Sequence, residues 1–266
     1  MYFMVEMKRV ITLALTICCL GCWHGDRNIL LRLKYKPGDQ LDVKYHTYIV
    51  ANNDLDNPIT NEIVRMSFKV DSVNGDSLYM MSAKIDYLRV ESGGAEYGNT
   101  YSSDQDEADM SPQQKQIHAA FKPMLDSTYK LIINTKGQII KPFAIGGPSI
   151  AQNFQPLNYS NCQVVFPAGK IAVGEDWSST AAMPIIGGKR ISSYHIENVF
   201  DGKIQIKESG RLTLNQGDSH EFSGRYMLDE KTKNLISAKI ELDADSFGEG
   251  RLKAVIEIEV KNWGFM

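Results

Sequence analysis

The stretch that decides the fold class is LKAVIEIEVK, residues 252–261. Apolar side chains stand at its even-numbered positions, and Lys253, Glu257, Glu259 and Lys261 stand between them. Because successive side chains of a β-strand point to opposite faces of the sheet, this period of two predicts a strand with one dry face and one wet face. Antiparallel sheets that are covered on one side only typically have this pattern.

Similar runs, less regular than this one, recur along the chain. They lie at 41–49, 64–70, 129–133, 194–206 and 235–242. Between the runs stand turn signals such as Asn74-Gly75-Asp76 and Asp201-Gly202, which offer residues that tolerate a positive φ. Residues 91–109 are polar, glycine-containing and acidic, and this composition predicts a long loop. The chain is therefore expected to be mostly β and antiparallel.

One segment has a helical pattern instead. Ser111 can accept hydrogen bonds from the free amides of a helix start, and Pro112 has the backbone angle of a first helical turn. Ile117 and Phe121 follow at a spacing that places them on one helical face. We expect one short helix near 112–121 that ends before Pro123, because proline cannot donate a backbone hydrogen bond within a helix.

The N-terminal residues resemble a bacterial export signal. Lys8 and Arg9 precede an apolar run, residues 10–20, which is too short to cross a bilayer. The run ends in Cys19-Leu20-Gly21-Cys22, which resembles the lipobox of bacterial lipoproteins, although leucine is usual at the place of Cys19. In such proteins the cysteine after a small residue receives a diacylglycerol. The resemblance predicts lipidation of Cys22, and the alternative is a secretory signal that is cleaved elsewhere.

Lipidation of Cys22 would decide where the protein is located. Residues 1–21 would be a lipoprotein signal peptide, and residues 22–29 a tether. Several acyl chains, at about 0.8 kcal/mol per buried methylene, would anchor the chain stably to the outer membrane. The residues Trp23-His24-Gly25-Asp26 lack the acidic run that accompanies surface export in such bacteria. We therefore expect a bacterial cell-envelope protein that faces the periplasm.

Composition limits the possible partners. The chain has 266 residues and a formal net charge of -3 at pH 7, so it lacks the basic excess that a nucleic-acid partner requires. If the signal is removed and Cys22 is acylated, only Cys162 remains in the folded part, and no intrachain disulfide can form. Stability must then come from a hydrophobic core, for which this length is sufficient.

The two halves of the chain repeat a similar pattern. The blocks that match, in the same order, are 38–41 with 174–177, 68–73 with 194–199 and 129–140 with 226–237. Each half opens with a glycine and acidic turn and continues into apolar strands. Chance similarity between hairpins is the alternative explanation, because all β-hairpin proteins share such patterns.

Duplication would divide the chain into two related units. Residues 30–143 would form a first β repeat that includes the helix, residues 144–160 a connector, and residues 161–266 a second β repeat. The expected fold class is mostly β, a β-rich α+β protein, with two related antiparallel curved sheets. These sheets would form an open barrel or a sandwich-like arrangement.

The chain also resembles a family of uncharacterised secreted lipoproteins of Bacteroidota. The resemblance depends on the lipobox and on Lys36-Pro37-Gly38-Asp39, Phe166-Pro167, Val173-Gly174-Glu175-Asp176-Trp177 and Tyr226-Met227-Leu228-Asp229. It covers most of residues 30–245. The resemblance implies a location in the envelope, but its motifs are structural in type and imply no activity or catalytic residue.

Sequence patterns for catalysis or metal binding are missing. The five histidines are scattered, with no metal-ligand spacing such as His-Glu-x-x-His. The densest acidic cluster comprises Asp104, Asp106, Glu107 and Asp109. It could bind a divalent cation weakly, or it could simply keep a surface loop solvated. We expect no catalytic residues, no metal, no cofactor and no enzymatic activity.

A binding role is the first functional hypothesis. Trp177 could stack on a sugar or cap an apolar groove, although an indole often just seals the end of a sheet. Met66, Phe68, Met80 and Tyr129 could line a groove for an apolar chain, and a dry core would use the same residues. We expect a carrier for an apolar or glycan ligand.

Two other functional classes stay open. The protein could be a structural or assembly partner whose exposed sheet edges dock on another envelope protein. It could also be a hydrolase whose carboxylates are remote in sequence but meet in space.

Overall fold

The structure is a computed structural model that describes ten parts of the chain. These parts are residues 28–51, 54, 58–75, 77–92, 99–141, 164–183, 188–214, 217, 219–244 and 252–263. The predicted signal peptide, the lipidation site Cys22 and the predicted connector lie outside the described residues, so these three assignments stay predictions.

The described part of the chain forms a large sheet, a small sheet, one α-helix and one short 3₁₀-helix. In chain order the elements are β1 (Ile29–Leu30), β2 (Gln40–Ala51), β3 (Thr60–Asn74), β4 (Leu78–Ser92), β5 (Asn99–Ser102), η1 (Glu107–Asp109), α3 (Pro112–Leu125), β6 (Thr128–Asn134), β7 (Ile139–Lys141), β8 (Lys170–Ile171), β9 (Asp176–Met183), β10 (Gly188–Phe200), β11 (Lys203–Leu214), β12 (Ser219–Asp229), β13 (Leu235–Ala244) and β14 (Leu252–Trp263).

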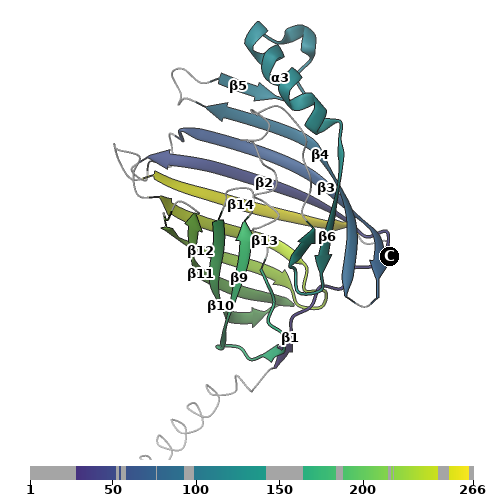
Figure 1. The fold of residues 1–266 in the computed structure, drawn as a ribbon, viewed down its shortest axis with the longest axis vertical. Coiled ribbons are helices and arrows are strands. Elements are labelled where there is room, and N and C mark those ends of the chain that lie inside the picture. Colours follow the sequence, from purple (N-terminus) through teal and green to yellow (C-terminus); the bar gives the residue numbers. More distant parts are fainter. Residues whose placement is uncertain are drawn as a thin grey trace, which may run out of the picture.

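One antiparallel sheet of twelve strands dominates the molecule, and Figure 1 shows that it is strongly curved. Its order is β7-β6-β4-β3-β2-β14-β13-β12-β11-β10-β9, with β5 paired beside β4. The pairing of β14 with β2, from Leu252 opposite Ala51 to Trp263 opposite Gln40, joins the two halves. A mostly β, antiparallel fold with one short helix is thus confirmed. The two expected sheets are, however, one continuous sheet, because β14 bridges them.

The hydrophobic core covers one side of this sheet, which we call the concave face; the opposite side is the convex face. In β14, Ile256 and Ile258 contribute to the core, and Glu259 is exposed on the convex face. Val255, the apolar residue that breaks the alternation of this strand, is buried on the convex side. The period of two therefore correctly predicts which face of β14 meets the core.

Residues 28–36 and 164–173 contain the strands of the small sheet, β1 and β8, and we call these two segments the floor; Figure 1 shows β1 at the lower end of the curved sheet. Their strands β1 and β8 pair with each other. The amide of Leu33 donates to the carbonyl of Thr135 at 2.8 Å, and the amide of Phe166 donates to that of Lys136 at 2.9 Å. On the other side, the Trp177 indole donates to Val165 at 2.8 Å. The floor thus links the β6–β7 turn to β9.

The helix α3 begins as expected, with a capping box in which Ser111 and Gln114 exchange hydrogen bonds. It continues through Pro123 to Leu125, so the predicted end before Pro123 is wrong. Met124 is buried beyond the proline, and the amide of Asp126 donates to the carbonyl of Lys122. This burial and this closing hydrogen bond hold the last turn despite the missing proline donor.

The described residues of the segment 91–109, which are 91–92 and 99–109, do not form the long loop that the composition predicts; residues 93–98 lie outside the described residues. β4 continues to Ser92, β5 pairs antiparallel with its end, and Asp106 caps the short helix η1. Tyr101 of β5 is almost fully buried against Phe121 of α3, with ring centroids 5.5 Å apart. This packing gives the polar segment its order. No helix in the described part of the chain is long and apolar enough to cross a membrane.

The two halves share several backbone details. Gly38 and Gly174 have φ values of 92° and 90°, and their amides donate to Val70 and Ile196 respectively. A β-bulge follows immediately after each of these acceptors. Such details support an internal duplication, which stays a prediction.

The third matched block has a different register in the sheet from that in the sequence alignment. Leu131 pairs with Met81, whereas Tyr226 pairs with the Ile206 of the other half. Met81 pairs with Val70, and Ile206 pairs with Ile196, in each case directly before the bulge. Met81 and Ile206 are therefore equivalent in the two halves, so Tyr226 corresponds to Leu131 and not to Tyr129.

Candidate functional site

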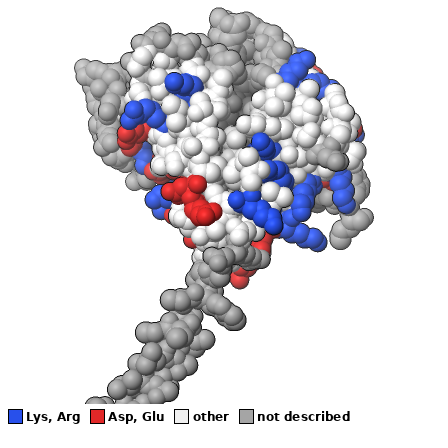
Figure 2. All heavy atoms as spheres, turned by 60° about the horizontal axis from the view of Figure 1, so that its bottom comes forward, with Lys and Arg blue, Asp and Glu red and all other residues white. Residues whose placement is uncertain are grey.

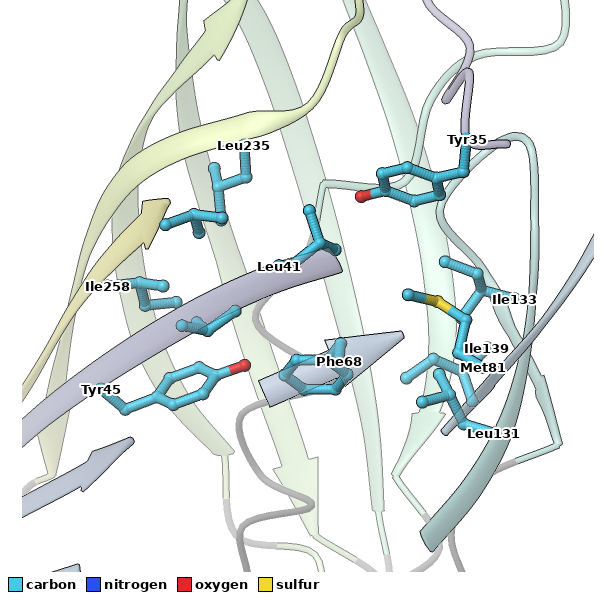
Figure 3. A pocket seen from close by; sticks show the side chains of 12 residues that line it. Tyr35, Leu41, Tyr45, Phe68, Met81, Leu131, Ile133, Ile139, Leu235 and Ile258 are labelled. Atoms are coloured by element: carbon cyan, nitrogen blue, oxygen red, sulfur yellow. The ribbon is translucent and has the colours of Figure 1, made fainter. Parts of the chain in front are cut away.

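A small cavity lies on the concave face of the sheet, between the strands of the first half and the neighbouring strands of the second (Figure 3). Its volume is about 40 Å³. The side chains that line it are Tyr35, Leu41, Val43, Tyr45, Phe68, Met81, Leu131, Ile133, Ile139, Leu235, Ile258 and Val260. An apolar cavity that binds benzene has about 150 Å³. A larger ligand must therefore displace some of the lining side chains.

Among the described lining residues, two tyrosines supply the polar side-chain atoms. Figure 3 shows the hydroxyl groups of Tyr35 and Tyr45 on opposite sides of the cavity, both directed inward. Tyr35 packs edge-to-face on Tyr79, with ring centroids 5.2 Å apart and an interplanar angle of 74°. Burial, helped by Tyr79 and Asp39, raises the pKa of the Tyr35 hydroxyl above its ordinary value. The lining is therefore uncharged at neutral pH.

The predicted groove residues are divided between the cavity, the core and the surface. Phe68 lines the cavity. Met66 is buried beside it on β3 but is not among the lining residues, and Tyr129 is buried with its hydroxyl donating to Met124 at 2.8 Å. Met80 is 44% exposed on the convex face. It does not belong to a groove, because its neighbours Tyr79 and Met81 occupy the concave face.

Trp177 seals the lower end of the sheet. Its indole N–H is used by the carbonyl of Val165, and its ring stacks on Tyr194 with centroids 5.1 Å apart and an angle of 21°. Only 9% of the residue is exposed. Trp177 is thus placed as the end of a packed core and does not line the cavity.

Sequence reasoning missed most of the cavity. Of the lining residues, the sequence patterns identify only Phe68. Tyr35 is missed because it precedes the first long strand. Leu235 and Ile258 are missed because they come from the second half of the chain. The alternation of Leu33 and Tyr35 with exposed Lys34 and Lys36 is a usable signal for inward-pointing residues. The convergence of β2, β6 and β13 has no local signal, because it depends on the strand order.

A buried polar cluster occupies another part of the concave face. Arg190 of β10 donates from Nη2 to Glu208 Oε2 at 2.5 Å and to the Tyr226 hydroxyl at 2.9 Å, and Tyr226 also donates to Glu208. Glu208 is fully buried, and its Oε1 has no hydrogen-bond partner among the described residues. Burial raises the pKa of the Tyr226 hydroxyl strongly, although the Arg190 charge opposes this shift.

Two glycines leave space for this cluster. The Phe222 ring lies against Gly210, and the Arg190 guanidinium sits 4.9 Å from the centre of the same ring. A Cβ atom at Gly224 would lie 3.0 Å from the Tyr226 ring and 3.1 Å from Glu208 Oε2. Small residues at these two positions are therefore part of how the sheet accommodates the buried charges.

The convex face carries shallow hollows. Two of them, of about 480 and 470 Å³, meet at Ser193 and Ser209. His195 Nδ1 lies 2.7 Å from Asp176 Oδ1 in one of them, and both side chains are more than a third exposed. No serine hydroxyl hydrogen-bonds this histidine among the contacts described, so the pair does not form a nucleophilic triad.

The acidic cluster of the sequence has local structural roles. Asp104 accepts from the Ser102 hydroxyl at 2.5 Å, and Asp106 accepts from the Ala108 amide at 2.9 Å. Across the described ranges, no group of three or more His, Cys, Asp or Glu side chains is arranged to hold a metal ion.

Comparison with known proteins identifies a shared fold but no family. No protein-family model matches the sequence, and no curated protein matches it significantly. The structure is similar to a solved structure of lipovitellin, described as "lipid-protein interactions in lipovitellin", with a TM-score of 0.54 and 11% sequence identity. The match covers 87% of this chain and 26% of that one. This chain therefore spans about a quarter of the lipovitellin chain and shares its fold over that part.

Proposed function

We propose that this protein is a non-catalytic binding or carrier protein that holds an apolar ligand against the concave face. The cavity supports the proposal, because aliphatic, aromatic and methionine side chains from both halves of the sheet converge on it without a charged group. Sites for small apolar molecules typically have this composition, with a few polar atoms that orient the ligand. The fold shared with lipovitellin, a protein studied for its interactions with lipid, agrees with this reading.

An apolar ligand fits these residues better than a glycan does. A sugar needs several hydrogen-bond partners, whereas the lining offers only the hydroxyls of Tyr35 and Tyr45. Trp177, the residue best suited to stack on a sugar, is already covered by Tyr194 and bonded to Val165. The ligand class is therefore an aliphatic chain or ring system with at most a small uncharged polar end.

Binding requires side chains to move, because the cavity of about 40 Å³ is smaller than an acyl chain. Met81 can make room by changing rotamers, since its thioether side chain is unbranched and flexible. Phe68, also on the lining, is only partly buried. These two side chains lie on the neighbouring strands β3 and β4, and their movement would enlarge the cavity along the concave face.

We also propose that the protein is a lipoprotein anchored in the bacterial cell envelope. The residues Cys19-Leu20-Gly21-Cys22 support this location, as does the resemblance to Bacteroidota lipoproteins. Mass analysis of the full chain isolated from cells is the direct test. An N-terminal diacylglycerol on Cys22 is expected, and a mature N-terminus at any other residue would contradict the proposal.

A role in assembly is the second candidate, favoured by one end of the sheet. β9 is the last strand of the order, and its residues Asp176–Met183 include neither proline nor lysine, which commonly block edge pairing. Photo-crosslinking from Thr180 in intact cells would test this role. If this edge binds a partner, a crosslinker at Thr180 should attach to one defined envelope protein.

Substitution at the cavity tests ligand binding. Val43→Phe adds a ring to the lining, and we expect the full chain carrying it to bind methyl dodecanoate about tenfold more weakly. Val199→Phe is the matched control, because Val199 packs against the core without lining the cavity. Equal affinity in both variants, or no binding by the unmodified chain, would contradict the proposed site.

A further inference from the structure

The floor carries a group of cations that its contacts bring together. Arg32 donates to the carbonyls of Pro167, at 2.7 Å, and Ala168, which ties the two floor segments to each other. Lys170 on β8 lies opposite Leu30 on β1. The outer surface of the floor is therefore shaped by both segments, although they are more than a hundred residues apart in the sequence.

Three lysines extend this group. Lys34 and Lys36 are exposed and alternate with the inward-facing Leu33 and Tyr35. Lys136 lies in the adjacent turn, where its carbonyl accepts from a floor amide. We call these residues the floor cations: Arg32, Lys34, Lys36, Lys136 and Lys170.

The described carboxylates next to the floor bind backbone amides. The acidic residues of the adjoining turns, Asp39 and Glu175, accept hydrogen bonds from the backbone amides of Lys36 at 2.7 Å and Ala172 at 2.8 Å. No ion pair joins a floor cation to an acidic side chain among the described residues. The sheet differs in this respect, since several of its lysines are paired: Lys44 with Glu259, Lys130 with Asp71 and Lys253 with Glu241.

An exposed apolar side chain lies within this basic surface. Leu30 is 47% exposed, although leucines 31 and 33 beside it are buried. Leu30 lies opposite Lys170 and two residues before Arg32. An exposed apolar side chain beside cations is a combination found where proteins touch a membrane surface, since the apolar side chain enters the head-group region and the cations bind phosphates.

The proposed acyl anchor on Cys22 would bring this surface near a membrane. The described chain begins at Asn28, within the floor, and Figure 2 shows basic side chains gathered to one side of the entry point and a group of acidic side chains on the other side. Cys22 precedes Asn28 by six residues, which span at most about 20 Å when extended. An acyl anchor on Cys22 would thus keep the floor close to the lipid head groups.

We propose that the floor is a docking surface for anionic lipid head groups. Leu30 and the floor cations hold the floor against the bilayer, and the cavity lies above it inside the fold. The net charge of -3 is a sum over the whole chain, so it does not reveal this local basic surface. The inference concerns orientation at the membrane and does not depend on the ligand of the concave face.

Vesicle binding by the full chain with Cys22→Ser tests the proposal without any acyl anchor. The probes are vesicles of phosphatidylcholine alone and of phosphatidylcholine with about one third phosphatidylglycerol. Because each lysine near an anionic bilayer strengthens binding about fivefold, binding to the anionic vesicles should be at least about tenfold stronger. The difference should shrink as salt is added.

Charge reversal locates the surface. Lys34→Glu with Lys36→Glu should abolish the preference for anionic vesicles; both side chains are exposed, and the described contacts assign them no side-chain partner. The control is Lys84→Glu with Lys207→Glu, which changes the net charge equally on the convex face. Equal binding to both kinds of vesicle, or equal losses in the two double variants, would overturn the proposal. Failure of the apolar ligand to bind would leave this result unchanged.

Discussion

Arg190 and Glu208 form a charged pair in the interior of the concave face, where they are 8% and 0% exposed. Taking two charges out of water is costly, and the hydrogen bonds between them and to Tyr226 offset that cost. Glu208 Oε1 gains no such compensation from the described residues. We therefore expect the cluster to add little net stability compared with an apolar core of the same volume.

Removal of one charge should lower the free energy of unfolding much more than removal of both charges. Glu208→Gln leaves Arg190 buried without its counter-ion, so we expect the free energy of unfolding to fall by about 3–5 kcal/mol. Arg190→Met, Glu208→Leu and Tyr226→Phe combined should change it by only about 1 kcal/mol, because both charges and the hydroxyl that bonds them are removed together. Urea denaturation measures both values. This account would be contradicted if the triple variant lost as much free energy of unfolding as the three single variants added together.

Tyr101 should make the protein sensitive to alkaline pH. Burial raises the pKa of its hydroxyl from 10.0 to about 12, so the folded state holds its proton more tightly than the unfolded chain does. The resulting stability is fully present below pH 10 and is lost as the pH rises towards 12. In Tyr101→Phe the free energy of unfolding should fall less steeply over this range. Parallel pH profiles of the two proteins would show that Tyr101 does not contribute.

At the scale of single strands, Gly210 lets β10, β11 and β12 approach one another. A Cβ atom there would overlap the Ile191 carbonyl oxygen and would lie 2.5 Å from the Phe222 ring. Gly210→Ala should therefore lower the free energy of unfolding by about 1–3 kcal/mol. Gly169→Ala is the control, since nothing lies within 4 Å of its added carbon. Equal stabilities of the two variants in urea would contradict the close approach.

The sequence predicts individual elements well wherever one face of an element is buried. The alternation in 252–261 and the capping pattern at Ser111 both appear in the structure, as β14 and as the start of α3. These signals are local, and they arise from the same physical cause that forms the element. The pairing of β14 with β2 has no such signal, because residues at opposite ends of the chain meet.

The candidate site was harder to predict than the strands. The two adjacent methionines of β4, Met80 and Met81, must point to opposite faces, and the bulge after Val70 decides the register in which β3 meets them. Sequence reasoning chose Met80, whereas Met81 lines the cavity. A single-residue uncertainty in register thus exchanges a groove residue for a surface residue.

On the scale of the whole molecule, the seam between β14 and β2 makes two meanders into one sheet. If the sheet unfolds as one unit, amides at this central seam should exchange with solvent most slowly, and those of the end strands β7 and β9 most rapidly. Hydrogen-exchange mass spectrometry gives this order. Faster exchange at the seam than within either half would mean that the halves open as separate units.

The curved sheet also separates two surfaces with different chemical character. The concave face presents an uncharged cavity, and the floor presents cations that form no ion pair with any described residue, at the end where the chain enters the fold. A carrier anchored at a membrane would use both, because the floor fixes its orientation while the concave face holds the ligand. Substitution of Val43 tests the role of the concave face, and substitution of Lys34 with Lys36 tests the role of the floor, so the two roles can be separated.

Native mass spectrometry of the full chain, purified without added lipid, most directly tests whether the concave face binds an apolar ligand. The account predicts an additional bound mass from an apolar molecule, which is displaced by methyl dodecanoate and is reduced in Val43→Phe but not in Val199→Phe. A protein that shows only its own mass, and that takes up no methyl dodecanoate when the compound is offered, would contradict the account.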